Sequence, residues 1–249
     1  MYLLKQIEQS GRRETAKKLR ATISAIFRYA IVTMRSSSDP SAALKDVLLP
    51  PKVKSRAAIM DEQEFAQLLH RLDEYTGWPV ITAAMKFQIL TCTRPGETRG
   101  AKKQKFDLEA RPWTVPAERM KMRRDHVVSL SRQAFDIVID NWSESGAIEL
   151  LFPSLISGKK MLSENAFNTV LRRLGYSGHE ISAHGFRSTA STFLNAREYN
   201  PDIIEAVLAH QDPNAIRRTY NRATYWKQRV VLTQEWADLL DELRKSAHS

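Results

Sequence analysis

Apolar residues first recur at regular intervals between residues 15 and 34. They stand three or four positions apart, which is the spacing of one face of an α-helix. A serine-rich stretch ending in Asp39-Pro40 follows, and such a stretch is expected to stop a helix. Residues 15–34 are therefore predicted to form an amphipathic helix, with these residues on its apolar face: Leu19, Ile23, Ile26, Phe27, Ala30 and Ile31.

From about residue 59 the pattern predicts a larger, mainly helical body. Asp61 is a helix-start residue followed by apolar positions at helical spacing, and Pro95 suits the first position of a short helix. Between residues 104 and 130 the apolar positions stand in short runs typical of two or three strands. Further helices are expected at 79–92, 131–142, 163–174, 183–197, 202–209, 213–221 and 224–246. The predicted fold class is mainly α with a small antiparallel β-sheet (α+β).

The last predicted helix has apolar residues near helical spacing along its length. Such a face can dock on the protein's own body or on a neighbouring protomer, and the sequence leaves both alternatives open. The residues of this face are Trp226, Val230, Trp236, Leu240 and Leu243.

A basic, proline-containing stretch separates the two patterned regions. Residues 49–56 hold two prolines and no periodicity, which is typical of an extended linker. Fifty residues in two helices cannot bury much apolar surface alone. We therefore expect residues 1–50 to be the end of a longer helical domain, 51–58 a linker, and 59–249 the main domain.

Positive charge is concentrated before this boundary. The chain of 249 residues carries a formal charge of +10, of which residues 1–60 contribute +8 from twelve Lys/Arg and four Asp/Glu. Such a basic segment suits contact with a polyanion, although a solvated basic helix face would have the same composition. The candidate phosphate-binding residues are Arg12, Arg13, Lys17, Lys18, Arg20, Lys52, Lys54 and Arg56.

Composition excludes several classes of protein. Cys92 is the only cysteine, so neither a disulfide framework nor a cysteine-rich zinc site is expected. No stretch of about 18 apolar residues occurs, and charged residues interrupt the amino-terminal segment. A soluble protein of the reducing cytoplasm, without a signal peptide or a bound metal, is the resulting expectation.

Four short segments could carry chemistry, although no glycine-rich phosphate loop is present. Each also has an ordinary alternative: a surface ion pair, a solvated basic turn, an exposed helix start, a core histidine or a packed aromatic residue. The segments contain Arg94 with Glu97, Lys121 in a basic turn, His184 with Arg187, and His210 followed by Tyr220.

The order of these residues resembles the tyrosine recombinase, or phage integrase, family. That family has the order Arg…Lys…His-x-x-Arg…His/Trp…Tyr, which here is Arg94, Lys121, His184, Arg187, His210 and Tyr220. The resemblance covers essentially the whole chain and is closest to the prophage-encoded branch. It rests on residues 117–122, 183–187, 208–210, 220–222 and 236–240, with 19–30 matching the end of the family's core-binding domain.

The resemblance implies a catalytic mechanism that uses side chains alone. Tyr220 is the expected nucleophile, forming a 3′-phosphotyrosyl link, and Lys121 the expected donor of a proton to the 5′-oxygen. Arg94 and Arg187 are expected to bind the phosphate, supported by Glu97. His184 is expected as a general acid or base, and His210 as a phosphate ligand or an orienting group.

The expected partner is double-stranded DNA at attachment sites in a bacterial cell, bound by a tetramer with possible accessory factors; no cofactor is expected. Asp125 and Ser129 stand where the family more often has proline, and residues 102–105 where it often has tryptophan. These departures concern loops and DNA contacts. Three alternatives remain: a catalytically inactive regulator derived from an integrase, a type IB topoisomerase-like enzyme, and a metal-dependent nuclease.

Overall fold

A computed structural model describes residues 2–51, 57–120, 123–144, 149–210 and 225–246. The chain divides into two compact units, Met1–Ser55 and Arg56–Ser249, and each is described here by itself. The assignment of the first unit to a DNA-binding domain stays a prediction.

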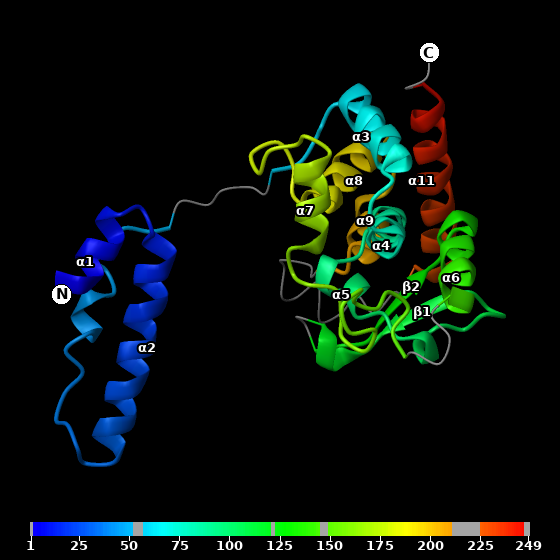
Figure 1. Cartoon of the computed structure of the whole chain (residues 1–249). Helices are drawn as coiled ribbons and strands as arrows, with labels where there is room; N and C mark the ends of the chain where they lie inside the picture. The colour runs from blue at the N-terminus through cyan, green and yellow to red at the C-terminus, as the bar shows by residue number, and fades with distance from the viewer. Residues whose placement is uncertain (1, 52–56, 121–122, 145–148, 211–224, 247–249) are drawn as a thin grey trace. The chain divides into compact units, whose positions relative to one another are not determined.

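The first unit consists of two helices and the segment that follows them (Figure 1). Helix α1 spans Tyr2–Gln9, helix α2 spans Arg13–Val32, and a short 3₁₀ helix, η1, spans Ala42–Leu44. Glu8 accepts hydrogen bonds from Lys5 (2.8 Å) and from the backbone N–H of Leu49 (2.6 Å).

The apolar face of α2 is mostly uncovered within this unit. Leu4 and Ala16 are the buried hydrophobic residues among the described part of the unit, whereas Ile26 is 61% exposed. A unit of this size has too little apolar surface to build a core of its own.

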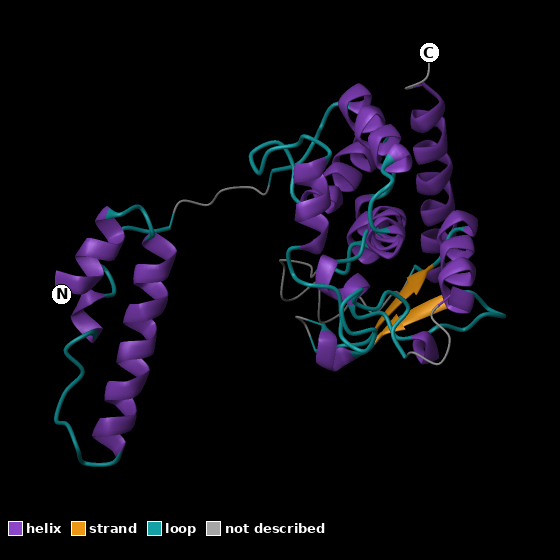
Figure 2. Ribbon diagram, in the orientation of Figure 1, coloured by secondary structure: helices purple, strands orange, loops and turns teal. Residues whose placement is uncertain are grey.

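The second unit is built around helix α4, Pro79–Thr91, which other helices enclose (Figures 1 and 2). Apolar residues occur on all sides of this helix, and nine of its thirteen residues are buried, as expected of a central helix. The surrounding helices are α3 (Glu62–Glu74), α5 (Pro95–Arg99), α6 (Arg132–Glu144), α7 (Ala166–Arg173), α8 (Gly185–Ala196), α9 (Pro201–Val207) and α11 (Trp226–Ser246).

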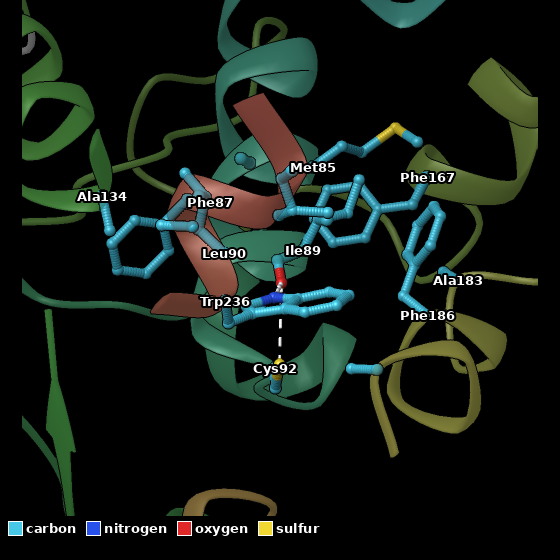
Figure 3. Close-up of a cluster of buried hydrophobic side chains, with 14 of the residues drawn as sticks. Met85, Phe87, Ile89, Leu90, Cys92, Ala134, Phe167, Ala183, Phe186 and Trp236 are labelled. Atoms are coloured by element: carbon cyan, nitrogen blue, oxygen red, sulfur yellow. Dashed lines mark hydrogen bonds between the residues drawn. The ribbon is translucent and has the colours of Figure 1, made fainter. Parts of the chain in front are cut away.

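The last helix, α11, packs on the body of its own chain. Trp236 is buried and donates a hydrogen bond from its indole Nε1 to the carbonyl oxygen of Ile89 in α4, at 2.9 Å (Figure 3). Leu240 is also buried, whereas Val230 is 42% exposed. Trp236 and Leu240 therefore pack on the body of their own chain, which is one of the two alternatives that the sequence left open for this face.

A two-stranded antiparallel sheet lies at one edge of this unit (Figure 2). Strand β1, Pro112–Val115, pairs with β2, His126–Ser129, and Trp113 faces Val128 in the register. Phe106 lies at the start of the region where two or three strands were expected. It forms only an isolated bridge with Trp113, and the centroids of the two stacked rings lie 5.3 Å apart.

These elements confirm the predicted fold class. Every helix expected from residue 59 onwards is present within about three residues at either end, except the one at 213–221, which lies outside the described residues. Asp61 caps α3 as expected, because its carboxylate accepts from the backbone N–H of Glu64 at 2.9 Å. None of the helices described is long and apolar enough to cross a membrane.

Candidate active site

Glu97 caps the start of α5 by accepting hydrogen bonds from Arg94. The carboxylate of Glu97 accepts from the backbone N–H of Arg94 and from its Nη1, both at 2.8 Å. Pro95 at the first helical position favours this start. Glu97 is only 4% exposed, so the pair is not the ordinary surface ion pair that the sequence also allowed.

Arg187, on α8, is buried beneath the junction between α4 and α5. Its Nη1 donates to the carbonyl oxygen of Cys92 at 2.5 Å, and its Nη2 donates to the carbonyl oxygen of Leu208. Burial and, to a smaller extent, the charge of the neighbouring Arg94 together lower the pKa of Arg187 to about 10. A guanidinium buried in this way cannot belong to a merely exposed helix start.

Cys92 aims its carbonyl at Arg187 through an unusual backbone conformation. It ends α4 with a left-handed φ of 53°, which lets the chain turn sharply before Arg94. Its thiol is buried, and burial raises the pKa of Cys92 to about 12. The thiol therefore stays neutral, and the backbone of this residue is what contacts the site.

His184 is the N-cap residue of α8 and is half-buried. Gly185 follows it directly. The helix begins close to the chain that enters this unit, since the backbone N–H of Ser182 donates to the carbonyl oxygen of Ala57 at 3.1 Å. The beginning of α8 is thereby tied to the end of the linker.

The turn that ends α9 contacts both arginines. The carbonyl oxygen of Ala209 accepts from Nη2 of Arg94 at 3.2 Å, and that of Leu208 accepts from Arg187. Carbonyl groups at a helix end have no partner within the helix, so guanidinium groups suit them. This turn thus holds both guanidinium groups in one place although they come from segments far apart in the sequence.

His210 follows in the same turn. Its Nδ1 lies 2.9 Å from Oε2 of Glu205 on α9, and its side chain is 41% exposed, which excludes a core histidine. Burial lowers the pKa of His210 and the charge of Arg187 adds to this, whereas the carboxylate of Glu205 acts in the opposite direction.

His126 is a residue of this site that sequence reasoning missed. It is buried at the start of β2, and burial together with the charges of Arg229, Arg187 and Arg94 lowers its pKa to about 3. Val127 and Val128 are equally apolar in the sequence, so only the structure, in which His126 and Val128 are buried and Val127 is exposed, shows that His126 faces inward. Its imidazole is therefore neutral at physiological pH.

Arg229 was also missed, because it lies in a helix that the sequence marked only for packing. It is buried, donates from Nη2 to the carbonyl oxygen of Val127, and lies 5.5 Å from the ring of Trp226. Burial lowers the pKa of Arg229 to about 10. It contributes positive charge next to His126.

Arg119 links the turn before Lys121 to α5. Its Nη2 donates to the carbonyl oxygen of Gly96 at 2.7 Å, and its Nη1 donates to that of Gly100. Lys121 itself lies outside the described residues, and so do Tyr220 and the linker residues Lys52, Lys54 and Arg56.

The structure thus brings together four of the residues singled out in the sequence: Arg94, Glu97, Arg187 and His210. The two arginines lie near enough to depress the pKa of Arg187, so a bound anion would relieve their repulsion. Planar guanidinium groups suit the oxygens of a phosphate group, and this arrangement can bind one. Among the described residues, no group of three or more His, Cys, Asp or Glu could hold a metal ion.

Comparison with known proteins identifies the family of this chain. Residues 58–226 match the phage integrase family and residues 1–47 match the phage integrase central domain. Prophage integrase IntA of Escherichia coli K12 is 37% identical over 234 residues, which are 94% of this chain and 56% of that protein. The chain thus spans little more than half the length of this relative.

Solved structures share the fold at lower identity. A lambda integrase dimer bound to a COC′ core site has a TM-score of 0.64 at 18% identity, covering 90% of this chain and 78% of that one. A lambda integrase tetramer bound to a Holliday junction has a TM-score of 0.63 at 17% identity, covering 86% and 63%. With one family match spanning more than half of its residues and a relative this similar, the chain belongs to the phage integrase family.

Proposed function

We propose that this chain is the DNA-binding and catalytic portion of a site-specific DNA recombinase, a prophage integrase that integrates or excises a mobile element. The observation that carries the proposal is the convergence of Arg94, Arg187 and His210 on the turn that ends α9. Two guanidinium groups held by backbone carbonyls form a rigid site for one phosphate group of DNA.

The reaction exchanges one phosphodiester for another. The hydroxyl of Tyr220 attacks the scissile phosphate, a 3′-phosphotyrosyl bond forms, and the bond to the 5′-oxygen breaks. His184 accepts the tyrosine proton, and Lys121 donates a proton to the departing 5′-oxygen. A 5′-hydroxyl of another strand then reverses these steps and releases Tyr220.

Arg94 and Arg187 stabilise the charge that builds up on the non-bridging oxygens in the transition state. A single preorganised donor of this kind contributes about 2.7–4 kcal/mol. Glu97 supports the reaction by holding Arg94 in place, because its carboxylate accepts two hydrogen bonds from Arg94. The energy of the phosphodiester is conserved in the phosphotyrosyl bond, so the proposed reaction needs no ATP, and the side chains supply the charge stabilisation without a metal ion.

The proposed partner is double-stranded DNA at attachment sites, bound by a tetramer in the bacterial cytoplasm and assisted by accessory DNA-bending or directionality factors. Two related structures are described as a dimer on a core site and a tetramer on a Holliday junction. In this proposal residues 1–50 are part of the core-binding domain, 51–58 the linker and 59–249 the catalytic domain.

Basic residues at the start of α2 are the proposed phosphate contacts of the first unit. Arg12, Lys17 and Lys18 are exposed, whereas Arg13 and Arg20 are half-buried and lie 3.5 Å from backbone carbonyls of the following segment. With Lys52, Lys54 and Arg56 of the linker they would contact phosphates without recognising bases. DNA binding should therefore weaken steeply as salt is raised from 50 to about 200 mM.

Trapping of a covalent adduct tests the proposal. The chain is incubated with nicked duplexes in EDTA, and denaturant-resistant adducts are mapped by peptide sequencing. We expect an adduct on Tyr220 that is lost in Tyr220→Phe and retained in Tyr225→Phe, a matched control five positions away. DNA binding without an adduct would instead identify an inactive regulator, and relaxation of plasmid lacking an attachment site a topoisomerase.

A further inference from the structure

The turn that ends α9 brings two side chains together by its backbone geometry. The N–H of Ala209 donates to the carbonyl of Ala206 (3.3 Å), and the N–H of His210 donates to that of Glu205 (3.0 Å). Ala209 has a left-handed φ of 48°. These are the two hydrogen bonds and the left-handed residue of a Schellman motif, which places the residues at its two ends side by side.

In such motifs the two end positions frequently make a hydrophobic contact. Here they hold a carboxylate and an imidazole: Oε2 of Glu205 lies 2.9 Å from Nδ1 of His210. The backbone and the side chains thus join the same two residues, so the imidazole is held in one orientation. Its other nitrogen, Nε2, lies on the opposite side of the ring.

We propose that Glu205 is a positioning residue: it holds Nδ1–H of His210 and favours the doubly protonated imidazolium, whose Nε2–H then donates to the phosphate. This inference rests on the proposed function, since it assigns a second partner to a phosphate ligand of that site. A neutral imidazole that gives its only N–H to Glu205 would present a lone pair to the phosphate, so the second proton is essential.

Charges from three elements face His210 within the described part of the chain. Arg187 of α8 and Arg94 before α5 disfavour the imidazolium, and Glu205 of α9 favours it. The two arginines are needed for phosphate binding and cannot be dispensed with. Glu205 therefore offsets a repulsion that the site itself creates, and an incoming phosphate would add to its effect.

Two substitutions of Glu205 distinguish the effect of its hydrogen bond on the orientation of His210 from the effect of its negative charge. Glutamine in Glu205→Gln can still accept from Nδ1–H, but it has no charge, so the pKa of His210 should fall. Glu205→Ala removes both effects. Glu74→Gln is the matched control, because Glu74 lies 3.4 Å from His70 in a similar pair on α3.

The experiment has two arms, both with the full chain. In the first, ¹⁵N NMR of labelled imidazoles follows the titration and tautomer of His210, assigned with His210→Gln. We expect Nδ1 to stay protonated in the wild type, and the His210 titration to move to lower pH in Glu205→Gln but not in Glu74→Gln. In the second, adduct formation on nicked duplex DNA is measured against pH, and its alkaline limit should likewise move to lower pH in Glu205→Gln.

An unchanged His210 titration in Glu205→Gln, or a neutral tautomer protonated at Nε2, overturns the inference whether or not the chain cleaves DNA. So does an unchanged pH profile of adduct formation. A shifted titration without any wild-type adduct supports the Glu205–His210 pair and counts against the proposed function, so the two failures are distinguishable.

Discussion

Replacement of Gly185 by alanine should destabilise the second unit, because there is no room for the added methyl group. A Cβ at this position would lie 2.1 Å from the carbonyl oxygen of Ala57 and 3.1 Å from Cα of Ala58. Ordinary contacts begin at 3.4 Å, so the backbone of Ala57 must move by about 1.3 Å. That displacement breaks the hydrogen bond from the N–H of Ser182 to the same oxygen.

The expected loss of stability follows from the crowded methyl group and from the broken hydrogen bond. Forcing a methyl group into packed structure costs about 1–3 kcal/mol, and the lost hydrogen bond about 0.5–1.5 kcal/mol. The free energy of unfolding should therefore fall by about 2–4 kcal/mol. For a unit of roughly 200 residues this lowers the melting temperature by about 5–15 °C.

Thermal unfolding followed by circular dichroism measures this shift. Gly96→Ala is the matched control, since its Cβ would meet nothing nearer than Nη2 of Arg99 at 3.9 Å. Gly96 lies in α5, where alanine is favoured over glycine by about 0.5–1 kcal/mol, so this variant should melt at or above the wild-type temperature. A Gly185→Ala protein that melts like the wild type would refute the packing argument.

Three further substitutions test separate parts of the site. Ala209→Gly should raise the free energy of unfolding by about 0.5–1 kcal/mol, because glycine adopts the left-handed φ of 48° without strain; a lower melting temperature would contradict this. Glu97→Ala should lower the free energy of unfolding by about 2–4 kcal/mol, measured by urea unfolding, because Arg94 loses two hydrogen bonds to a buried carboxylate. An unchanged urea midpoint would show that water replaces these hydrogen bonds. His126 has a pKa of about 3 in the folded protein, whereas it takes up a proton near pH 6.5 in the unfolded chain. The stability that the neutral His126 contributes is therefore complete above pH 6.5 and is lost as the pH falls towards 3. Between pH 7 and 5 the wild type should lose about 2 kcal/mol more than His126→Gln in urea titrations, and equal losses would assign the acid sensitivity to other groups.

Local signals in the sequence account for the helices and for part of the site. The carboxylate of Asp61 accepts from Glu64 just where the helix was expected to begin, and Pro95 begins α5. Such caps act within one turn of helix, so they can be recognised without knowledge of the rest of the fold. The order of the Arg, Lys, His and Tyr residues likewise sufficed to indicate the family, which the comparisons confirm.

Hydrophobic spacing shows which face of a helix is buried but not which surface covers it. The apolar face of α11 suited either the chain's own body or a neighbour, and only the structure brings Trp236 to the carbonyl of Ile89. Phe106 had the character of a strand residue, yet it stacks on Trp113 and forms only an isolated bridge. Both outcomes depend on contacts between distant segments.

The sequence by itself determined the helical body, the small sheet and the candidate phosphate-binding residues. The tertiary structure alone decided that Arg187 donates to the backbone of Cys92 and Leu208, that Glu205 meets His210, and that His126 and Arg229 lie beside them. The physical reason is that backbone carbonyls accept hydrogen bonds whatever their side chains are, so no residue type marks them in the sequence. A buried histidine or arginine near the site is likewise recognised only when the packing of distant elements is known.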